Sequence, residues 1–442
     1  MPFGLARINR MFGMCRSQGT VSLGFGKEIG MKKYVLAVDV GKGKSKIGLF
    51  GVNTQTMRVE TILKPKDYAH SESELGCLLT GIGDLPVGDI GVMMESTYVY
   101  QSPLVVFFRR HGFTEISVIN PLKIKKSCGD IQKVKTDKID CRRIARFYFF
   151  SEWTVPIEIS EEHREARELS RYIDSMIKEK TSLMCRLRQH LCMVFPEIES
   201  IAGEKSPITS DGFLNLFESG MHPETLKKKT VPGIVTLMAG KGKRHQAYTD
   251  YAVKIKEAAK HSLYTAKEDG VEVTIIIPDI VRRLKGLIRK IGELEEKLAS
   301  MTEKNDIFAV LESFDGIGRK LASHLTAEIW ETVSYATPQK LIASIGINPS
   351  RSQSGETIDR YGKIVKAGNR YIRHWLFEAI SSILRQRPRG HGDIRISDYY
   401  NKKHSDEKLH HYAATIACCN KLVRQFYYRS RDLIKTKELI IK

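Results

Sequence analysis

Two aspartates in a basic stretch are the first residues of this sequence whose spacing suggests chemistry. Asp137 and Asp140 lie three positions apart in Lys133-Val-Lys-Thr-Asp-Lys-Ile-Asp-Cys-Arg-Arg143. If Thr136 is the N-cap of a helix, both carboxylates project from one helical face. Such a pair can hold a hard divalent cation, and the surrounding lysines and arginines attract polyanions. The stretch therefore suggests phosphodiester chemistry on nucleic acid, or an ordinary solvated start of a helix.

Two further acids end predicted strands. Residues 34–41 form a predicted buried strand that closes on Asp39 and a glycine, with residues 46–50 as its hairpin partner. Residues 90–98 form another strand, which carries Glu95 at its end. Because sites in α/β sheets form at the carboxyl ends of strands, we expect both acids there. Ribonuclease-H-like folds and actin-like sugar kinases both begin with such a hairpin, and this local pattern does not separate them.

The composition favours a nucleic-acid partner. The chain has 442 residues, of which 71 are Lys or Arg and 51 are Asp or Glu, for a net charge of +20. This length predicts two or three domains, and the excess of basic residues favours a polyanion. No stretch is long and apolar enough to span a bilayer. The eight scattered cysteines contain no Cys-x-x-Cys pair, which argues against a zinc knuckle and for reduced thiols in a cytoplasmic protein.

The middle of the chain is predicted to be helical. Residues 160–191 form a long helix, and the polar, basic residues 200–275 form an insertion or a small helical subdomain. From Pro278 a coiled-coil seam repeats at three- and four-residue spacing through Ile280, Leu284, Leu287, Ile291, Leu294, Leu298 and Met301. The seam serves self-association or packing on a neighbouring helix, and the pattern does not choose between them.

The last third combines glycine turns, serines and bases. Gly316-Ile-Gly318 separates two predicted helices, in the form of a helix-hairpin-helix whose amides can bind phosphate, or of a plain turn. Three serines occupy a predicted loop between Pro349 and Gly355, and a basic strand or hairpin follows. A serine in a polar loop is usually a turn former, but beside arginines it can attack phosphate. Helices are predicted at 372–385 and 409–428, the second with Ala413, Ile416, Ala417 and Leu422 on its inner face.

Together these segments resemble the DEDD-type transposases of bacterial insertion-sequence family 110, which are bridge-RNA-guided serine recombinases. The resemblance runs in order from about Lys33 to Tyr428. It is carried by Val38-Asp-Val-Gly41, Met94-Glu-Ser-Thr97, Val118-Ile-Asn-Pro121, Lys135-Thr-Asp-Lys-Ile-Asp140, Ile144-Ala145, Gly316-Ile-Gly318, Ile345-Gly-Ile-Asn-Pro349, Gln353-Ser-Gly355, Lys366-Ala-Gly-Asn369 and Arg373. Two positions depart from the family pattern: Tyr98 stands where Gly is usual and Cys141 where Ala is usual. Both are interpreted as packing changes that touch no proposed ligand.

The resemblance implies an α/β RuvC-like domain of ribonuclease-H fold, a mostly α-helical coiled coil and a C-terminal transposase domain. The expected divisions are a disordered or mis-annotated arm at 1–30, the catalytic domain at 31–155, the helical region at 156–305 and the transposase domain at 306–442. The implied partners are donor and target double-stranded DNA, a structured non-coding guide RNA and further copies of the chain in a dimer or tetramer. With sequence choice left to the RNA, the protein would mainly hold nucleic-acid backbone.

The predicted function is DNA strand transfer for an insertion element. Asp39, Glu95, Asp137 and Asp140 would bind Mg²⁺, and Ser354 would attack the scissile phosphate, activated by the metal or one of the acids. The predicted nucleic-acid contacts are Lys135, Lys138, Arg351, Arg360, Lys363, Lys366, Arg370 and Arg373. The alternatives are a metal-dependent RuvC-like junction nuclease without a covalent intermediate, a non-catalytic nucleic-acid-binding scaffold and, more distantly, an actin-like kinase, for which a second phosphate-binding loop is missing.

Overall fold

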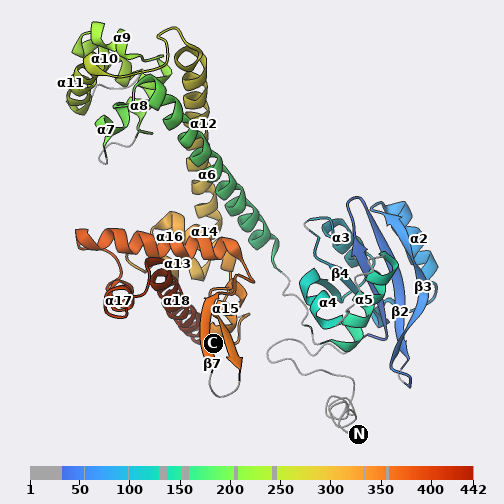
Figure 1. The fold of residues 1–442 in the computed structure, drawn as a ribbon. Helices are drawn as coiled ribbons and strands as arrows, with labels where there is room; N and C mark the ends of the chain where they lie inside the picture. Colours follow the sequence, from blue (N-terminus) through green and yellow to red (C-terminus); the bar gives the residue numbers. More distant parts are fainter. Residues whose placement is uncertain are drawn as a thin grey trace. The chain divides into compact units, whose positions relative to one another are not determined.

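The computed structural model describes most of the chain as two compact units that divide after residue 158 (Figure 1). The described residues are 32–53, 55–97, 99–128, 137–151, 153, 159–203, 208–240, 246–332, 334–354 and 358–441. Within the described residues, no helix has both the length and the apolar character that a membrane crossing requires.

The first unit is built on a mixed five-stranded sheet in the order β3-β2-β1-β4-β5. The strands are β1 (Tyr34–Val40), β2 (Lys44–Asn53), β3 (Arg58–Ala69), β4 (Ile90–Glu95) and β5 (Ile116–Ile119). β1, β2 and β3 form an antiparallel meander, and β4 and β5 run parallel to β1. The hairpin that the sequence predicted at residues 34–50 is therefore confirmed, and the strand predicted at 90–98 is confirmed over Ile90–Glu95.

Helices cover both faces of this sheet. α2 (Glu72–Ile82) and α3 (Ser102–Arg110) pack on the face lined by Leu36, Val38 and Met94. α4 (Pro121–Cys128) and α5 (Asp137–Phe150) pack on the opposite face. A mixed sheet with helices on both faces is the arrangement of a ribonuclease-H-like fold, as predicted. A short 3₁₀ turn at Val87–Asp89 leads into β4.

Sequence reasoning missed β3 and α2. β3 is an edge strand, and most of its residues are exposed or half-buried, among them Lys64, Pro65 and Lys66. Such a strand lacks the continuous apolar run that marked β1 and β4, because only one side of it pairs. It was therefore invisible to a search for buried strands.

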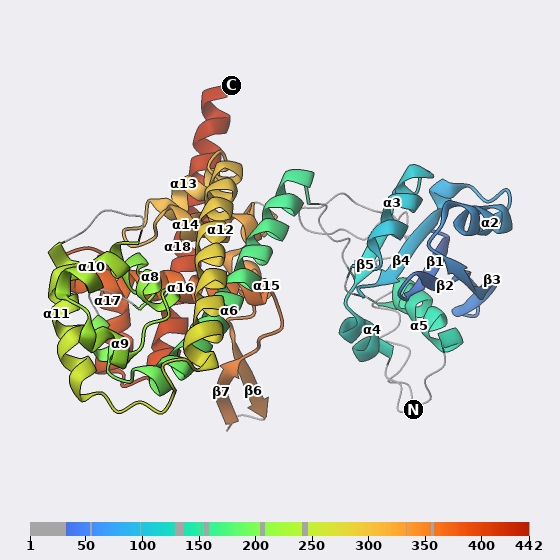
Figure 2. The same cartoon turned by 90° about the horizontal axis from the view of Figure 1, so that it is seen from above.

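Two long helices form the spine of the second unit (Figures 1 and 2). α6 (Glu161–Val194) begins at Ser160, whose hydroxyl accepts from the backbone N–H of His163 at 3.2 Å. The start of α12 (Ile277–Thr302) shares a core with the end of α6, and the end of α12 shares one with the start of α6, so the two helices are antiparallel. All seven predicted seam residues belong to these two cores. The seam therefore packs on a neighbouring helix of the same chain.

The segment between these helices is a small helical subdomain. This was one of the two structures predicted for residues 200–275, the other being an insertion. It contains α7 (Ile198–Ala202), α8 (Asp211–Glu218), α9 (Pro223–Lys228), α10 (Val231–Ala239), α11 (Gln246–His261) and a π-helical turn at Glu272–Ile276. Its apolar core is continuous with the facing ends of α6 and α12. The subdomain is thus a folded extension of the spine.

The C-terminal part forms a third apolar core at the other end of the spine. It contains α13 (Asp306–Glu312), α14 (Arg319–Ile329), α15 (Pro338–Ile345), the hairpin β6 (Pro349–Ser354) and β7 (Ile358–Ile364), α16 (Arg370–Gln386), a 3₁₀ turn (Arg387–Arg389), α17 (Ile394–Asn401), a π-helical turn (Lys402–Asp406) and α18 (His411–Ile441). The predicted glycine turn joins α13 to α14. Gly316 has φ +97°, and a Cβ there would lie 2.8 Å from the Cα of Ile383, so only glycine fits.

The predicted inner face of the last helix is partly wrong. Leu422 is buried, but Ala413 is exposed and Ile416 and Ala417 are half-buried. The face that reaches the core instead contains Ala414, Cys418, Cys419, Leu422, Val423, Phe426 and Tyr427. Because the helix carries small apolar residues on two adjoining faces, periodicity alone did not show which one is covered.

Candidate active site

The carboxyl ends of β1 and β4 bring two acids side by side. The parallel register pairs Val38 with Met94. Asp39 and Glu95 are the next residues on the two strands, so they are neighbours across the sheet. Side chains alternate along a strand, and the residues two positions earlier on each strand pack in the core beneath α5. Both acids therefore project toward the face that α5 covers. Adjacent strands lie about 4.8 Å apart, which is close enough for two carboxylates to share a cation.

The beginning of α5 brings a third acid to the same end of the sheet. Asp140 is half-buried and forms an ion pair with Arg143 at 3.1 Å. The next residue, Cys141, is fully buried, and its thiol donates to the carbonyl oxygen of Lys46 at 3.3 Å. Lys46 lies opposite Asp39 in the β1–β2 register. The thiol therefore anchors the first turns of α5 beside Asp39.

Two of the acids, Asp39 and Asp140, affect the pKa of the Cys141 thiol. Burial raises the pKa of the Cys141 thiol to about 12, against a hydrogen bond with the Asp39 backbone that lowers it. The negative charges of Asp39 and Asp140 act in the same direction as burial, and the positive charge of Lys46 opposes them. Cys141 is a packing residue, as expected, but it lies directly against a proposed ligand, which corrects the sequence interpretation.

The acids at this end of the sheet, Asp39, Glu95 and Asp140, fit a hard divalent cation, because such ions prefer carboxylate oxygens as ligands. Asp137 begins α5, one turn before Asp140. The side chains of Asp137 and Lys138 lie outside the described residues, and Lys135 and Thr136 lie outside them entirely. Among the side chains that the structure describes, no three His, Cys, Asp or Glu residues form a group able to hold a metal ion. The four-carboxylate set thus stays a prediction, with three members placed by the fold at one end of the sheet.

The predicted serine loop is a β-hairpin. Ser350, Ser352 and Ser354 all belong to β6. Ser354 is the last residue of β6 and pairs with Ile358. The Ser350 hydroxyl donates to the carbonyl oxygen of Lys363 across the hairpin at 3.0 Å. The side chains of residues 351–361, including those of Ser354, Arg351 and Arg360, lie outside the described residues.

The remaining predicted bases follow the hairpin. Lys363 lies on β7, and Lys366 adopts φ +55° between β7 and α16. Arg370 stacks on the Tyr371 ring at 4.9 Å. Arg373 instead donates to the carbonyl oxygen of Ile345 at 2.7 Å, and burial lowers its pKa. The side chains of Lys363, Lys366 and Arg370 are exposed and could contact nucleic acid. Arg373 instead connects the end of α15 to α16 through its hydrogen bond.

A close backbone contact supports this junction. A Cβ at Gly368 would lie 2.2 Å from the carbonyl oxygen of Ser344. The backbone N–H of Asn369 donates to the same oxygen at 3.1 Å, and the Asn369 side chain caps the start of α16. Glycine in the Lys-Ala-Gly-Asn motif is thus required by the approach of two chain segments.

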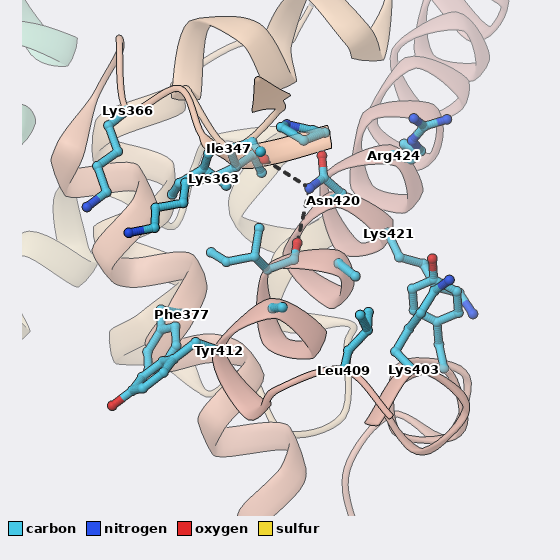
Figure 3. Close-up of a pocket in the computed structure, with 17 residues that line it drawn as sticks. Ile347, Lys363, Lys366, Phe377, Lys403, Leu409, Tyr412, Asn420, Lys421 and Arg424 are labelled. Carbon is cyan, nitrogen blue, oxygen red and sulfur yellow. Dashed lines mark hydrogen bonds between the residues drawn. The ribbon is translucent and has the colours of Figure 1, made fainter. Parts of the chain in front are cut away.

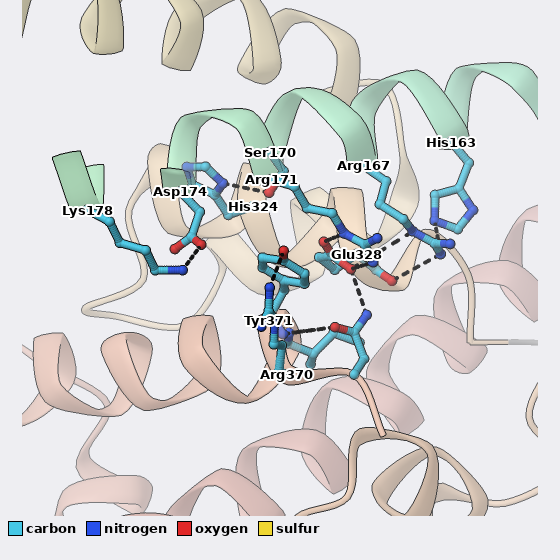
Figure 4. Close-up of polar contacts among 12 residues, drawn as sticks. His163, Arg167, Ser170, Arg171, Asp174, Lys178, His324, Glu328, Arg370 and Tyr371 are labelled. Atoms are coloured by element: carbon cyan, nitrogen blue, oxygen red, sulfur yellow. Dashed lines mark hydrogen bonds and ion pairs between the residues drawn. The ribbon is translucent and has the colours of Figure 1, made fainter. Parts of the chain in front are cut away.

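A buried carboxylate fixes the start of α16 to the spine (Figure 4). Glu328 on α14 has a fully buried side chain. It accepts two hydrogen bonds from Arg171 on α6, at 2.8 and 3.0 Å, and one from Asn369 at 2.6 Å. These residues come from three distant segments, so no local pattern in the sequence pointed to them. The network connects the segment after the serine hairpin to α6.

Comparisons with known proteins match both halves of the chain. Residues 36–196 match a family model for the DEDD transposase of IS110 elements, described as "Transposase". Residues 309–394 match a model described as "Transposase IS116/IS110/IS902 family". The first match contains the three placed acids, and the second contains the serine hairpin.

A curated protein shows a more distant similarity. The chain is 23% identical over 234 residues to the "Insertion element IS110 uncharacterized 43.6 kDa protein" of Streptomyces coelicolor. The match covers 52% of this chain and 54% of that protein, so the chain spans about half the length of the relative that it matches.

Proposed function

We propose that this chain is a DEDD transposase of the IS110 family, an enzyme that transfers DNA strands, and that it moves an insertion element by cutting and rejoining DNA. The observation that supports the proposal best is the pairing of Asp39 and Glu95 at the ends of adjacent strands, with the first turns of α5, which carry Asp140, held against Lys46 by the Cys141 thiol. Carboxylates gathered in this way repel one another unless a cation neutralises them.

We propose that Asp39, Glu95, Asp137 and Asp140 hold Mg²⁺. When bound, the ion supplies a positive charge that polarises a phosphate oxygen. The chain's own contribution is to hold the carboxylates at fixed positions. The sheet register holds two of them, and the Cys141 thiol holds the start of α5 against Lys46.

We propose that Ser354 is the nucleophile. Its Oγ would form a bond to the scissile phosphorus, and the bond from phosphorus to the oxygen of the leaving strand would break. The serine hydroxyl gives up its proton as it attacks, and the departing strand oxygen takes up a proton and becomes a hydroxyl. Attack by the hydroxyl of another strand, which loses its proton in turn, releases the serine with its hydroxyl reprotonated. Ser350 is a weaker candidate because its hydroxyl is engaged by the Lys363 carbonyl.

The remaining parts of the proposal concern partners. Guidance by a non-coding RNA that pairs with donor and target DNA suits a chain with net charge +20, because such a protein would mainly hold backbone phosphates. Action as a dimer or tetramer and a location in the cytoplasm complete the proposal.

The first test replaces one acid. Asp140→Asn removes one negative charge and should weaken Mg²⁺ binding, measured by calorimetry, and strongly reduce strand cleavage. The matched control is Asp89→Asn, which changes an aspartate in the same unit that pairs with Lys33 at 3.2 Å before the start of β4. Equal Mg²⁺ affinity in wild type and Asp140→Asn would remove this residue from the metal site.

The second test asks for a covalent intermediate. Denaturing electrophoresis of wild type with labelled DNA should show a protein–DNA adduct, and Ser354→Ala should bind DNA but form none. The loss of cleavage could reach about a million-fold for a missing nucleophile. Ser352→Ala, in the same strand, is the control. Cleavage without an adduct in wild type would favour the junction nuclease, and binding without cleavage would favour the scaffold.

A further inference from the structure

A pocket of about 1140 Å³ lies at the base of the serine hairpin, between the hairpin, α16, α17 and α18 (Figure 3). Its floor is apolar and includes Ile347, Ile416 and Ala417. These α18 residues are the ones that sequence analysis expected in the core. They lie on the face of α18 next to the buried one, and the fold leaves them lining a cavity.

The rim of this pocket is basic. Lys363, Lys366, Lys403, Lys421 and Arg424 line it, and none of the described residues that line it is acidic. Lys403 is paired with Glu407, and Lys421 lies 4.4 Å from the centre of the Tyr399 ring. Lys363, Lys366 and Arg424 have no ion pair with any carboxylate that the structure describes. The charge of the pocket therefore suits phosphate groups.

Two aromatic rings stand at the mouth of the pocket. Phe377 of α16 and Tyr412 of α18 stack with ring centroids 5.9 Å apart, and Tyr412 is 62% exposed. Aromatic faces bind unpaired bases by stacking, at about 1–3 kcal/mol per base. A paired base cannot offer its face in this way, because its neighbours in the duplex cover it.

We propose that this pocket binds an unpaired base of the DNA strand that reaches the serine hairpin. The base would stack on the exposed Tyr412 ring, which Phe377 backs, over the apolar floor. Lys363 and Lys366 on one side and Lys421 and Arg424 on the other would hold the flanking phosphates. DNA as the source, rather than RNA, rests on the proposed function, since Pro349, Lys363 and Ile364 of the hairpin form one wall of the pocket.

The hairpin also sets a distance along the DNA. Pro349 lines the pocket and Ser354 ends the same strand, five residues away. At about 3.4 Å per residue this is roughly 17 Å, or about five steps of a stacked DNA strand. The unpaired base should therefore lie about five nucleotides from the phosphate that Ser354 attacks.

The test uses the full-length chain and a short DNA strand carrying the fluorescent base 2-aminopurine. Stacking on Tyr412 should quench its fluorescence in wild type, and Tyr412→Leu should abolish the quenching and weaken single-strand binding roughly 5- to 100-fold. The matched control is Tyr428→Leu, which removes a tyrosine of the same helix that is 57% exposed and does not line the pocket. Its binding should equal that of wild type.

A second pair of variants tests the phosphate contacts. Arg424→Gln should lower the slope of log affinity against log salt by about 0.7 for a single strand, while Lys435→Gln, at an exposed α18 position outside the pocket, should leave it unchanged. The proposal is overturned if Tyr412→Leu and Tyr428→Leu behave alike, or if Tyr412→Leu weakens duplex binding as much as single-strand binding. It is also overturned if 2-aminopurine fluorescence is quenched in an RNA strand but not in a DNA strand, or if a mononucleotide binds as tightly as the strand. Because the readout is binding, a chain that proves unable to cleave DNA would overturn the proposed function and leave this measurement intact.

Discussion

Two buried histidines of the second unit have strongly lowered pKa values. His324 on α14 stacks on Trp375 with ring centroids 3.8 Å apart, and its Nδ1 lies 2.8 Å from the Ser170 hydroxyl of α6. Burial lowers the pKa of His324 to about 3, opposed by the charge of Asp174. His163, stacked on Trp330, has its pKa lowered to about 4 by burial and by Arg167. Both rings are neutral in the folded protein at neutral pH.

This neutrality predicts acid sensitivity. Below the ordinary histidine pKa of about 6.5, the unfolded chain binds protons that the folded chain does not. The free energy of unfolding should therefore fall as pH decreases from 6.5 toward 3. Thermal unfolding measured across this range should show the fall, and His324→Gln should make it shallower, because glutamine does not titrate. His261→Gln, at a 79% exposed side chain, should leave the dependence of the free energy of unfolding on pH unchanged. A wild-type pH dependence in His324→Gln would show that His324 is not the source of the acid sensitivity.

At the scale of elements, the pairing of α6 and α12 determines the architecture of the second unit. The pairing carries the helical subdomain at one end and the C-terminal core at the other. Its seam was as compatible with self-association as with packing inside one chain. The structure covers the seam with α6, so assembly into a dimer or tetramer, if it occurs, would use other surfaces.

Two isoleucines on α12 test this packing. Ile291 is 5% exposed and faces α6, whereas Ile288, one turn earlier, is 37% exposed. Ile291→Ala should lower the free energy of unfolding by about 2–5 kcal/mol, because it leaves a cavity. Ile288→Ala should change it by less than about 1 kcal/mol, since it makes the same chemical change at a surface position. Urea unfolding measures both. A large loss in Ile288→Ala with dissociation of an oligomer would instead favour an intermolecular seam.

At the scale of the whole molecule, the net charge of +20 predicts nucleic-acid binding that depends steeply on salt. Lys366 lies beside the serine hairpin at the rim of the pocket. Lys366→Ala should weaken binding to duplexes of different sequence alike and lower the slope of log affinity against log salt by about 0.9. Lys304→Ala, at an exposed position after α12, is the control. A change in sequence preference would show that Lys366 contacts bases instead of phosphates.

Local patterns in the sequence determined much of this protein. Continuous apolar runs marked β1 and β4, and the acids that end them could be named because strand ends are recognisable in sequence. Seven apolar residues at three- and four-residue spacing predicted α12. These features depend on neighbours within a few residues, so one sequence is enough to find them.

Tertiary structure decided the rest. That Asp39 and Glu95 lie side by side follows from the β1–β4 register, which brings together residues 56 positions apart. Pairing with β7 made the serine segment a strand, and the core chose which apolar face of α18 is buried. Glu328, Arg171 and Asn369 meet from three separate segments. Each of these depends on contacts between distant residues, and such contacts leave no periodic trace in a single sequence.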